Sequence, residues 1–184
     1  MSKIAKVKPY TIENGDGIRV SIFFSGCEHY CKNCFNSELW DFNIGETFSR
    51  EYYENKIKPL IKDYINGLTI LGGEPLHHKN LFATYRLVKW FKNDFPDKTI
   101  WLYTGYDFDI LNSKYNEYKY TPFAASADEW LTRWEIISNV DVLVDGEYID
   151  EQKDLTLKFR GSKNQRVIDV KQSLTQSKMV LYCD

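Results

Sequence analysis

Three of the four cysteines in this chain, Cys27, Cys31 and Cys34, lie within one short segment. Free cysteine often packs as a small buried hydrophobe, and the spacing i, i+4, i+7 would also place all three on one face of a helix. The residues between them are almost all polar, however, and Gly26 precedes them as a turn signal. The segment 27–34 therefore favours a loop whose thiolates bind a metal ion or an iron–sulfur cluster.

The spacing C-x3-C-x2-C supplies three thiolates, one fewer than structural zinc sites and iron–sulfur clusters normally take. The residues available as a fourth zinc ligand are His29, His77, His78 and Cys183. Because this spacing is not usual for zinc fingers, we favour an iron–sulfur cluster that keeps one iron open to a substrate. Zinc remains the alternative.

Length and composition predict a single domain over residues 1–184, large enough to bury on the order of 70% of its unfolded surface. The 24 lysines and arginines nearly balance the 26 acidic residues, so no basic field exists to hold a nucleic-acid backbone. The chain has no apolar run of about 18 residues and no secretory signal, so we expect no membrane partner and a cytoplasmic location. Clustered cysteines also fit a reducing compartment.

Short apolar segments alternate with helical patterns along the chain. The predicted strands are 19–25, 68–71, 99–104 and 140–144, with weaker edge strands at 167–170 and 179–182. The predicted helices start at Ser49 (ending near Asn66, with a kink at Pro59), after the 72–75 turn, and at a capping box over Ser126 to Glu129. This order predicts the α/β class, with a mostly parallel sheet and helices on the outside.

The chain is too short for eight strand–helix units, which take about 250 residues, so we expect an open partial (β/α) barrel. A polar, tyrosine-rich stretch at 112–120 is the candidate for a mobile excursion, within an inserted segment over about 107–125.

The turn Gly72-Gly73-Glu74-Pro75 follows the strand predicted at 68–71. Two glycines before proline also occur in ordinary loops. After a strand, however, they let backbone groups approach a ligand closely, and Glu74 adds a carboxylate that accepts from an ammonium group. Ligands of parallel sheets bind outside the carboxyl ends of the strands, where this turn and the cysteine loop both lie. An amino-acid moiety suits such an edge.

These motifs resemble the radical S-adenosylmethionine superfamily. Further stretches narrow the resemblance to activases of glycyl-radical enzymes, in particular the group that acts on the anaerobic ribonucleoside-triphosphate reductase. The matching stretches are Glu13 to Arg19, Phe24 to Cys27, Cys34 to Asn36, Gly72 to Leu76, Tyr103 to Tyr106, Val142 to Gly146 and Arg160 to Arg166.

The resemblance implies that Cys27, Cys31 and Cys34 hold a [4Fe-4S] cluster whose fourth iron chelates S-adenosylmethionine. A one-electron donor such as flavodoxin would reduce the cluster. The resulting 5'-deoxyadenosyl radical would then take a hydrogen atom from a glycine of the large reductase subunit. Because the cofactors carry this chemistry, no catalytic side chain is expected, and the sequence offers no convincing triad or carboxylate pair.

Site roles follow from the same resemblance. Asn33, Cys34 and Phe35 would offer backbone groups to the adenosyl moiety, and a second set would hold the methionyl ammonium group. That second set is Gly72, Gly73 and Glu74. The polar run Arg160, Ser162, Asn164 and Gln165 would bind the cofactor carboxylate or the partner chain, or form an ordinary solvated loop.

Two other functions stay open. One is an activase for another glycyl-radical enzyme, such as pyruvate formate-lyase, or a small-molecule radical enzyme. The other is a non-catalytic zinc or iron–sulfur module. Cys183 is interpreted as a spare thiol.

Overall fold

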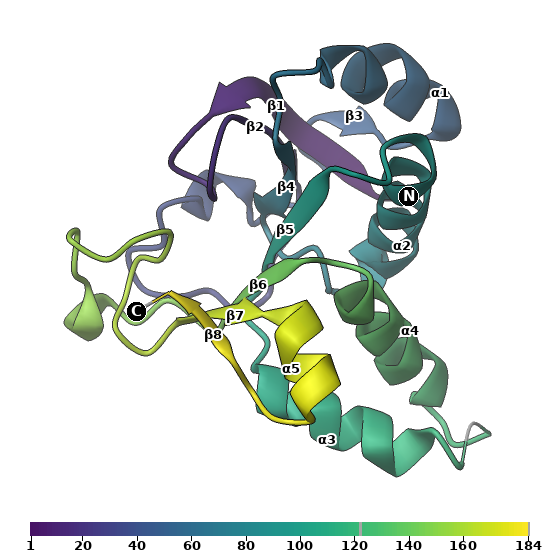
Figure 1. Cartoon of the computed structure of the whole chain (residues 1–184), viewed down its shortest axis with the longest axis vertical. Coiled ribbons are helices and arrows are strands. Elements are labelled where there is room, and N and C mark those ends of the chain that lie inside the picture. Colours follow the sequence, from purple (N-terminus) through teal and green to yellow (C-terminus); the bar gives the residue numbers. More distant parts are fainter. Residues whose placement is uncertain (122, 184) are drawn as a thin grey trace.

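The computed structural model describes residues 1–121 and 123–183 (Figure 1). In these residues one eight-stranded sheet has the order β3-β1-β2-β4-β5-β6-β7-β8. The strands are β1 (Lys3–Thr11), β2 (Arg19–Phe24), β3 (Glu46–Thr47), β4 (Gly67–Gly72), β5 (Thr99–Tyr103), β6 (Val142–Asp145), β7 (Arg166–Asp169) and β8 (Leu181–Cys183).

The four central strands, β2, β4, β5 and β6, are parallel neighbours, as expected for an α/β fold. The strands at both edges are antiparallel: β1 and β3 on one side, β7 and β8 on the other. The connection from β1 to β2 is short, and the one from β6 to β7 carries no α-helix among the described residues, so neither provides the crossover that a parallel pair needs. The sheet does not close, and the predicted barrel is therefore not confirmed.

The helices are α1 (Arg50–Tyr52), α2 (His78–Asp94), α3 (Phe108–Tyr118), α4 (Ala127–Ser138) and α5 (Val170–Gln176). Ser49 caps α1 as predicted, because its hydroxyl accepts from the Tyr52 N–H at 3.0 Å. Beyond α1 the helix widens to a π turn (Tyr53–Ile57) and tightens to a 3₁₀ turn (Lys58–Leu60), so it ends well before Asn66. Pro59 explains the early end, since it cannot donate to an α-helical ladder.

No helix in the described part of the chain has both the length and the apolar character needed to span a bilayer.

The third and fourth helices differ from the sequence pattern: part of the expected excursion is helical, and the predicted capping box is wrong. The stretch 112–120, expected as an excursion, lies largely in α3, which Asp107 caps by accepting from the N–H groups of Asp109 (2.8 Å) and Ile110 (3.3 Å). Residue 122 of the predicted inserted segment lies outside the described residues. Ser126 has a left-handed backbone (φ 73°), whereas an N-cap is extended, so the capping box does not form although α4 begins at the next residue.

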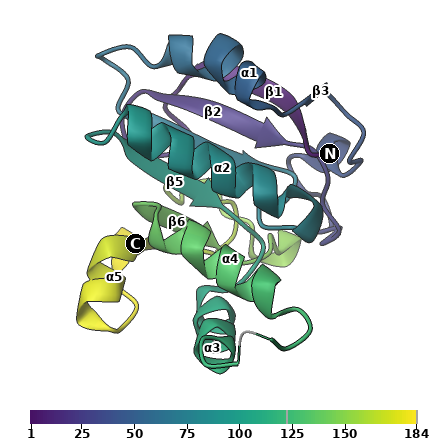
Figure 2. The same ribbon diagram turned by 90° about the vertical axis from the view of Figure 1, so that its right-hand side faces the viewer.

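Side chains of the central strands alternate between two faces of the sheet. We call the face under the helices the covered face; on it the strands pack with α2 and α4, which lie across the sheet in Figure 2. Its strand residues are Val20, Ile22, Phe24, Leu68, Ile70, Ile100, Leu102, Leu143 and Ile168. The opposite face, here called the open face, carries two smaller apolar clusters. Its strand residues include Phe23, Leu71, Trp101, Val142, Val144 and Val167.

Candidate functional site

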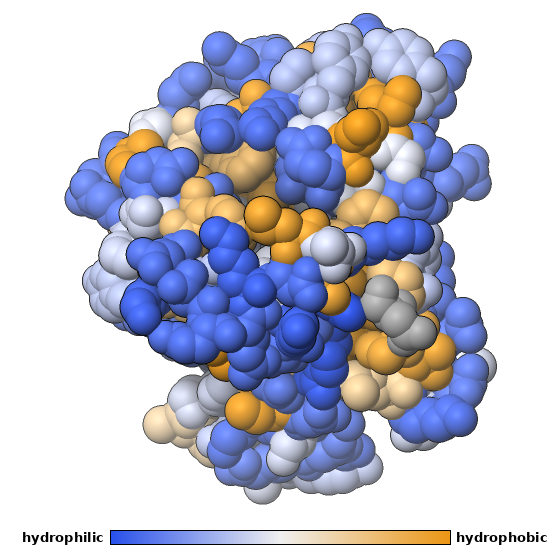
Figure 3. Space-filling view, turned by 90° about the vertical axis from the view of Figure 1, so that its left-hand side faces the viewer, coloured by the Kyte–Doolittle hydropathy of each residue, from blue (hydrophilic) through white to orange (hydrophobic). Residues whose placement is uncertain are grey.

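A cavity of about 530 Å³ lies on the open face, at the carboxyl ends of the parallel strands. Figure 3 views the molecule from this side and shows a band of hydrophobic surface between hydrophilic regions. All of the predicted site residues except Asn33 line the cavity. They are Cys27, Cys31, Cys34, Phe35, Gly72, Gly73 and Glu74. The fold therefore brings the cysteine loop and the double-glycine turn to one place.

The cysteine segment is a loop, so the alternative of three cysteines on a helix face is wrong. Tyr30 and Asn33 both have left-handed backbones, with φ of 53° and 55°. Gly26 turns the chain sharply out of β2 with φ of 92°, and a Cβ there would lie 1.9 Å from the ring of Phe42. Its N–H donates to the carbonyl oxygen of Leu39 at 2.7 Å, which fixes where the loop starts.

Burial favours the neutral form of the Cys27 and Cys31 thiols. Burial raises the pKa of Cys27 to about 12, and burial also raises the pKa of Cys31. Such thiols lose their protons readily only when a metal replaces them, which suits ligands better than reactive cysteines. Among residues 1–121 and 123–183, no three Cys, His, Asp or Glu side chains converge closely enough to hold a single metal ion.

The double-glycine turn packs directly on the cysteine loop. The Glu74 N–H donates to the Gly26 carbonyl oxygen at 2.7 Å, and the Gly73 N–H donates to that of Phe24 at 2.8 Å. A Cβ on Gly73 would lie 2.3 Å from the Gly26 oxygen, and Gly72 has φ of 115°. Both glycines are thus required by the fold itself, in addition to any ligand that approaches them.

Glu74 is buried, and its carboxylate is fully used within the protein. Oε1 accepts from the Leu76 N–H and the Thr104 hydroxyl, both at 2.8 Å. Oε2 accepts from the Gly105 N–H at 2.7 Å and lies 3.1 Å from Nε2 of His29. The side chain therefore ties the turn to the end of β5 and to the cysteine loop, while the Glu74 carbonyl oxygen accepts from the Asn80 side chain at 3.0 Å.

His29 is a candidate zinc ligand by residue type alone, but both of its ring nitrogens face carboxylates. Nδ1 lies 2.8 Å from Oε1 of Glu147, and Nε2 lies against Glu74. The hydrogen bond to Glu74 has the largest effect and, despite burial, raises the pKa of His29 to about 9. His77 is also engaged: Nδ1 accepts from the Lys79 N–H, and Nε2 pairs with Glu28 at 3.1 Å. Neither histidine is a free fourth ligand.

A segment beyond β6 runs along the cysteine loop. Lys32 donates to Glu151 at 2.8 Å, and the Asn33 side chain donates to Asp150 at 2.7 Å. The rings of Phe35 and Tyr148 lie 5.3 Å apart. These partners are more than 100 residues apart, and the only sequence signal for them is the acidic character of 147–151 opposite Lys32.

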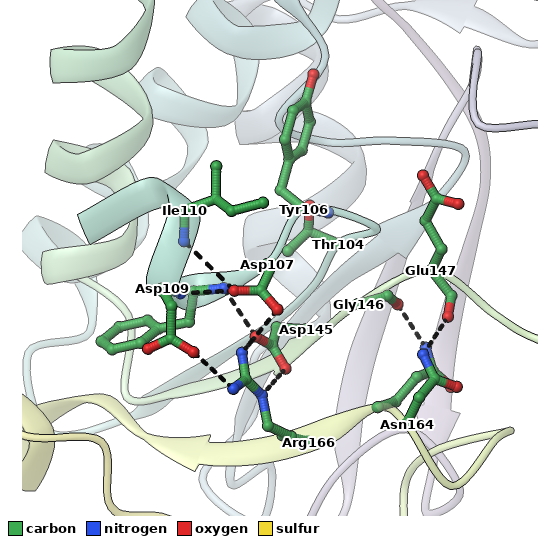
Figure 4. A network of polar contacts seen from close by, with 12 residues as sticks. Thr104, Tyr106, Asp107, Asp109, Ile110, Asp145, Gly146, Glu147, Asn164 and Arg166 are labelled. Carbon is green, nitrogen blue, oxygen red and sulfur yellow. Dashed lines mark hydrogen bonds and ion pairs between the residues drawn. The ribbon is translucent and has the colours of Figure 1, made fainter. Parts of the chain in front are cut away.

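Within the predicted polar run, most side chains hold the backbone. Asn164 donates to the Glu147 carbonyl oxygen at 2.8 Å (Figure 4), Gln165 donates to that of Gly146 at 3.0 Å, and Ser162 donates to Asn164 at 2.7 Å. Arg160 differs, because it lines the cavity and its buried Nε has no hydrogen-bond partner among the described residues.

Arg166, at the end of the run, is held by three aspartates (Figure 4). Its Nε donates to Asp145 at 3.0 Å, Nη1 to Asp109 at 2.8 Å and Nη2 to Asp107 at 3.1 Å. The Phe108 N–H also donates to Asp145, so β6, β7 and the start of α3 are joined at one point. Arg166 is thus a structural cation that uses four of its five N–H donors on these aspartates.

Known proteins are similar in sequence to this chain over most of its length. The model of a protein family described as a 4Fe-4S single cluster domain matches residues 13–168. An anaerobic ribonucleoside-triphosphate reductase-activating protein of Vibrio cholerae is 38% identical over 160 residues, 85% of this chain and 91% of the relative. Proteins of the same name from Enterobacteria phage T4 and Escherichia coli K12 are 36% and 34% identical, over 88% and 86% of this chain and 90% and 93% of the relatives.

Proposed function

The chain belongs to the family of anaerobic ribonucleoside-triphosphate reductase-activating proteins, and we propose that it installs a glycyl radical on the large subunit of that reductase. It is an activating enzyme that uses a [4Fe-4S] cluster and S-adenosylmethionine. The observation that carries the proposal is the single cavity lined by three thiols and by the Gly72-Gly73-Glu74 turn.

The residues of the cavity suit these groups. Cys27, Cys31 and Cys34 would each hold one iron of the cluster and would leave one iron without a protein ligand. When bound, the cluster and S-adenosylmethionine supply a 5'-deoxyadenosyl radical that takes a hydrogen atom from the target glycine. The protein itself binds, orients and shields these groups. Phe23 and Leu71 give the cavity an apolar wall that limits the access of water.

Each part of S-adenosylmethionine has a counterpart in the cavity wall. Backbone groups of Cys34 and Phe35 in the cavity wall, with those of the adjacent Asn33 outside the cavity lining, bind the adenosyl moiety. Carbonyl oxygens of Gly72 and Gly73 accept from the methionyl ammonium, and the Glu74 carboxylate holds that turn in place through its four internal contacts. Arg160 binds the methionyl carboxylate, which would give an anionic acceptor to its Nε, for which the described residues supply no partner.

The open face receives the glycine-bearing segment of the reductase. In this proposal the open face serves as the inner side of an open partial (β/α) barrel whose missing wall the reductase supplies. The electron comes from a one-electron donor such as flavodoxin, and the reaction takes place in the cytoplasm.

The test mixes the anaerobically reconstituted, reduced protein with S-adenosylmethionine and the large reductase subunit. We expect about four irons per chain, as a [4Fe-4S] cluster requires, and a glycine-centred EPR doublet on the reductase. A glycyl-radical enzyme of the pyruvate formate-lyase type, mixed in the same way, serves as the control and should give no signal. A protein that takes up only zinc and leaves S-adenosylmethionine intact would instead be the non-catalytic module.

A further inference from the structure

One histidine of the cysteine loop reaches the ends of three other strands. The His29 side chain is only 18% exposed and contacts Glu74 after β4 and Glu147 after β6. A Cβ on Gly105, after β5, would lie 2.7 Å from the imidazole ring, so the chain after β5 is shaped around that ring. The ring also meets Tyr106 edge-on at 5.3 Å between centroids.

The other polar contacts of the same loop are weaker restraints. Lys32 and Glu151 have side chains 70% and 68% exposed, and such surface pairs contribute little to stability. The Asn33 contact to Asp150 is exposed as well. The His29 side chain is less exposed than these residues, and it contacts the same Glu74 carboxylate that orders the double-glycine turn. The cysteine backbone and the turn are therefore linked through one imidazole.

We propose that His29 is a positioning residue: by bridging Glu74 and Glu147, it sets the distance between the open iron of the cluster and the turn that binds the methionyl ammonium group. This inference rests on the proposed function. His29 acts through the loop and not as an iron ligand, because both of its ring nitrogens face carboxylate oxygens. Misplacement of a binding group by about 1 Å can reduce a rate by roughly 100-fold. Loss of the one bridge that sets this distance should therefore have a large effect.

The deciding variant is His29→Ala in the anaerobically reconstituted full chain. We expect its iron content to stay near that of the unsubstituted protein, because the three thiols remain. We expect its dissociation constant for S-adenosylmethionine to rise at least tenfold. The change that S-adenosylmethionine causes in the EPR spectrum of the reduced cluster should also be lost, and a merely structural role would leave that change intact.

Three further variants sharpen the test. Lys32→Ala removes an exposed ion pair of the same loop and should leave the affinity within twofold. Glu147→Ala removes only the outer contact of His29 and should weaken binding about threefold. Glu147→Gln keeps an acceptor for the ring and should weaken binding less than Glu147→Ala does.

Unchanged affinity in His29→Ala, with iron content retained, would overturn the inference, as would an equal loss in Lys32→Ala. If His29→Ala fails to hold iron, Glu147→Ala decides: normal iron with unchanged affinity would overturn the inference, and normal iron with weakened binding would support it. Failure of the proposed function looks different, since the unsubstituted protein itself would then fail to bind S-adenosylmethionine.

Discussion

The two faces of the sheet come from the same strands but are held by different forces. On the covered face, Ile22 of β2, Ile70 of β4 and Leu102 of β5 are fully buried in one apolar cluster with the helices. On the open face, the alternate residues of the same strands border a cavity and depend on polar contacts from loops distant in sequence. Burial of apolar area therefore maintains the fold on one side, while specific polar pairs order the site on the other.

The open face also buries a charged side chain. Arg19 on β2 is buried on the open face, where it donates to the Thr69 hydroxyl at 2.8 Å and to the Thr99 carbonyl oxygen at 3.0 Å. Its guanidinium lies 5.5 Å from the Trp101 ring, and burial lowers its pKa to about 10. A cation so well supplied with acceptors is part of the scaffold beneath the cavity.

The largest effect should come from a cluster ligand. Cys34→Ala should abolish cleavage of S-adenosylmethionine, because an iron–sulfur cluster of this kind has no spare protein ligand. The measurement is 5'-deoxyadenosine formed under reductant. Cys183→Ala on β8 is the matched control and should retain cleavage; activity surviving in Cys34→Ala would contradict the assignment of the ligands.

Next in size is the loss of the cation held by three aspartates. Arg166→Ala leaves Asp145, 1% exposed, without its counter-charge, and loss of one partner of a buried ion pair costs about 3–5 kcal/mol. Urea unfolding of the metal-free protein measures this free energy. Asp109→Asn, at the exposed end of the same network, should cost less than about 1 kcal/mol. Equal effects would mean that burial of Asp145 does not decide the outcome.

A pair of neighbouring residues tests the two faces directly. Leu102→Ala on the covered face should destabilise the protein by about 2–5 kcal/mol, because it leaves a cavity in the apolar core. Tyr103→Phe on the open face should cost less than about 1 kcal/mol, since the buried hydroxyl has no partner among the described residues. Thermal unfolding of both variants gives the comparison, and a larger loss in Tyr103→Phe would refute it.

The smallest effect concerns a carboxylate on the helix side. Asp141 accepts from the Ile100 N–H and from Lys92, both at 2.7 Å, and from Lys171 at 2.5 Å. Burial raises the pKa of Asp141, but the hydrogen bonds from Lys171 and Lys92 outweigh it, and the net pKa lies below the usual value. The group therefore stabilises the fold above its unfolded pKa of about 3.9, and this contribution is lost as pH falls through the lower, folded pKa.

The measurement for Asp141 is the free energy of unfolding against pH in metal-free protein. Below about pH 4 the unsubstituted protein should lose on the order of 1 kcal/mol that Asp141→Asn does not lose. Parallel curves for the two proteins would show that the carboxylate contributes no such linkage.

The sequence predicted the parallel centre well, because β2, β4, β5 and β6 are short apolar runs whose burial depends little on their partners. The strand β1 was not predicted, because Lys6 and Lys8 interrupt its apolar pattern and the segment is ordered by its pairing with β2. The helix α3 was not predicted either; it is held by contacts such as the stacked rings of Tyr115 and Trp134, 5.1 Å apart.

For the site, the cysteine loop and the double-glycine turn were predictable because each is a local motif. The bridge from His29 to Glu147 and the contact of Asn33 with Asp150 were not, since these residues are more than 100 positions apart. Only part of the role of Glu74 could be predicted from the sequence. Its carboxyl group was identified, but the four internal donors that occupy it come from three separate segments.

The sheet ends in very short strands, two residues in β3 and three in β8. A strand this short offers few free N–H and C=O groups, so a second molecule gains little by adding its own strand there. The short edge strands therefore disfavour self-association of this protein through the edges of its sheet.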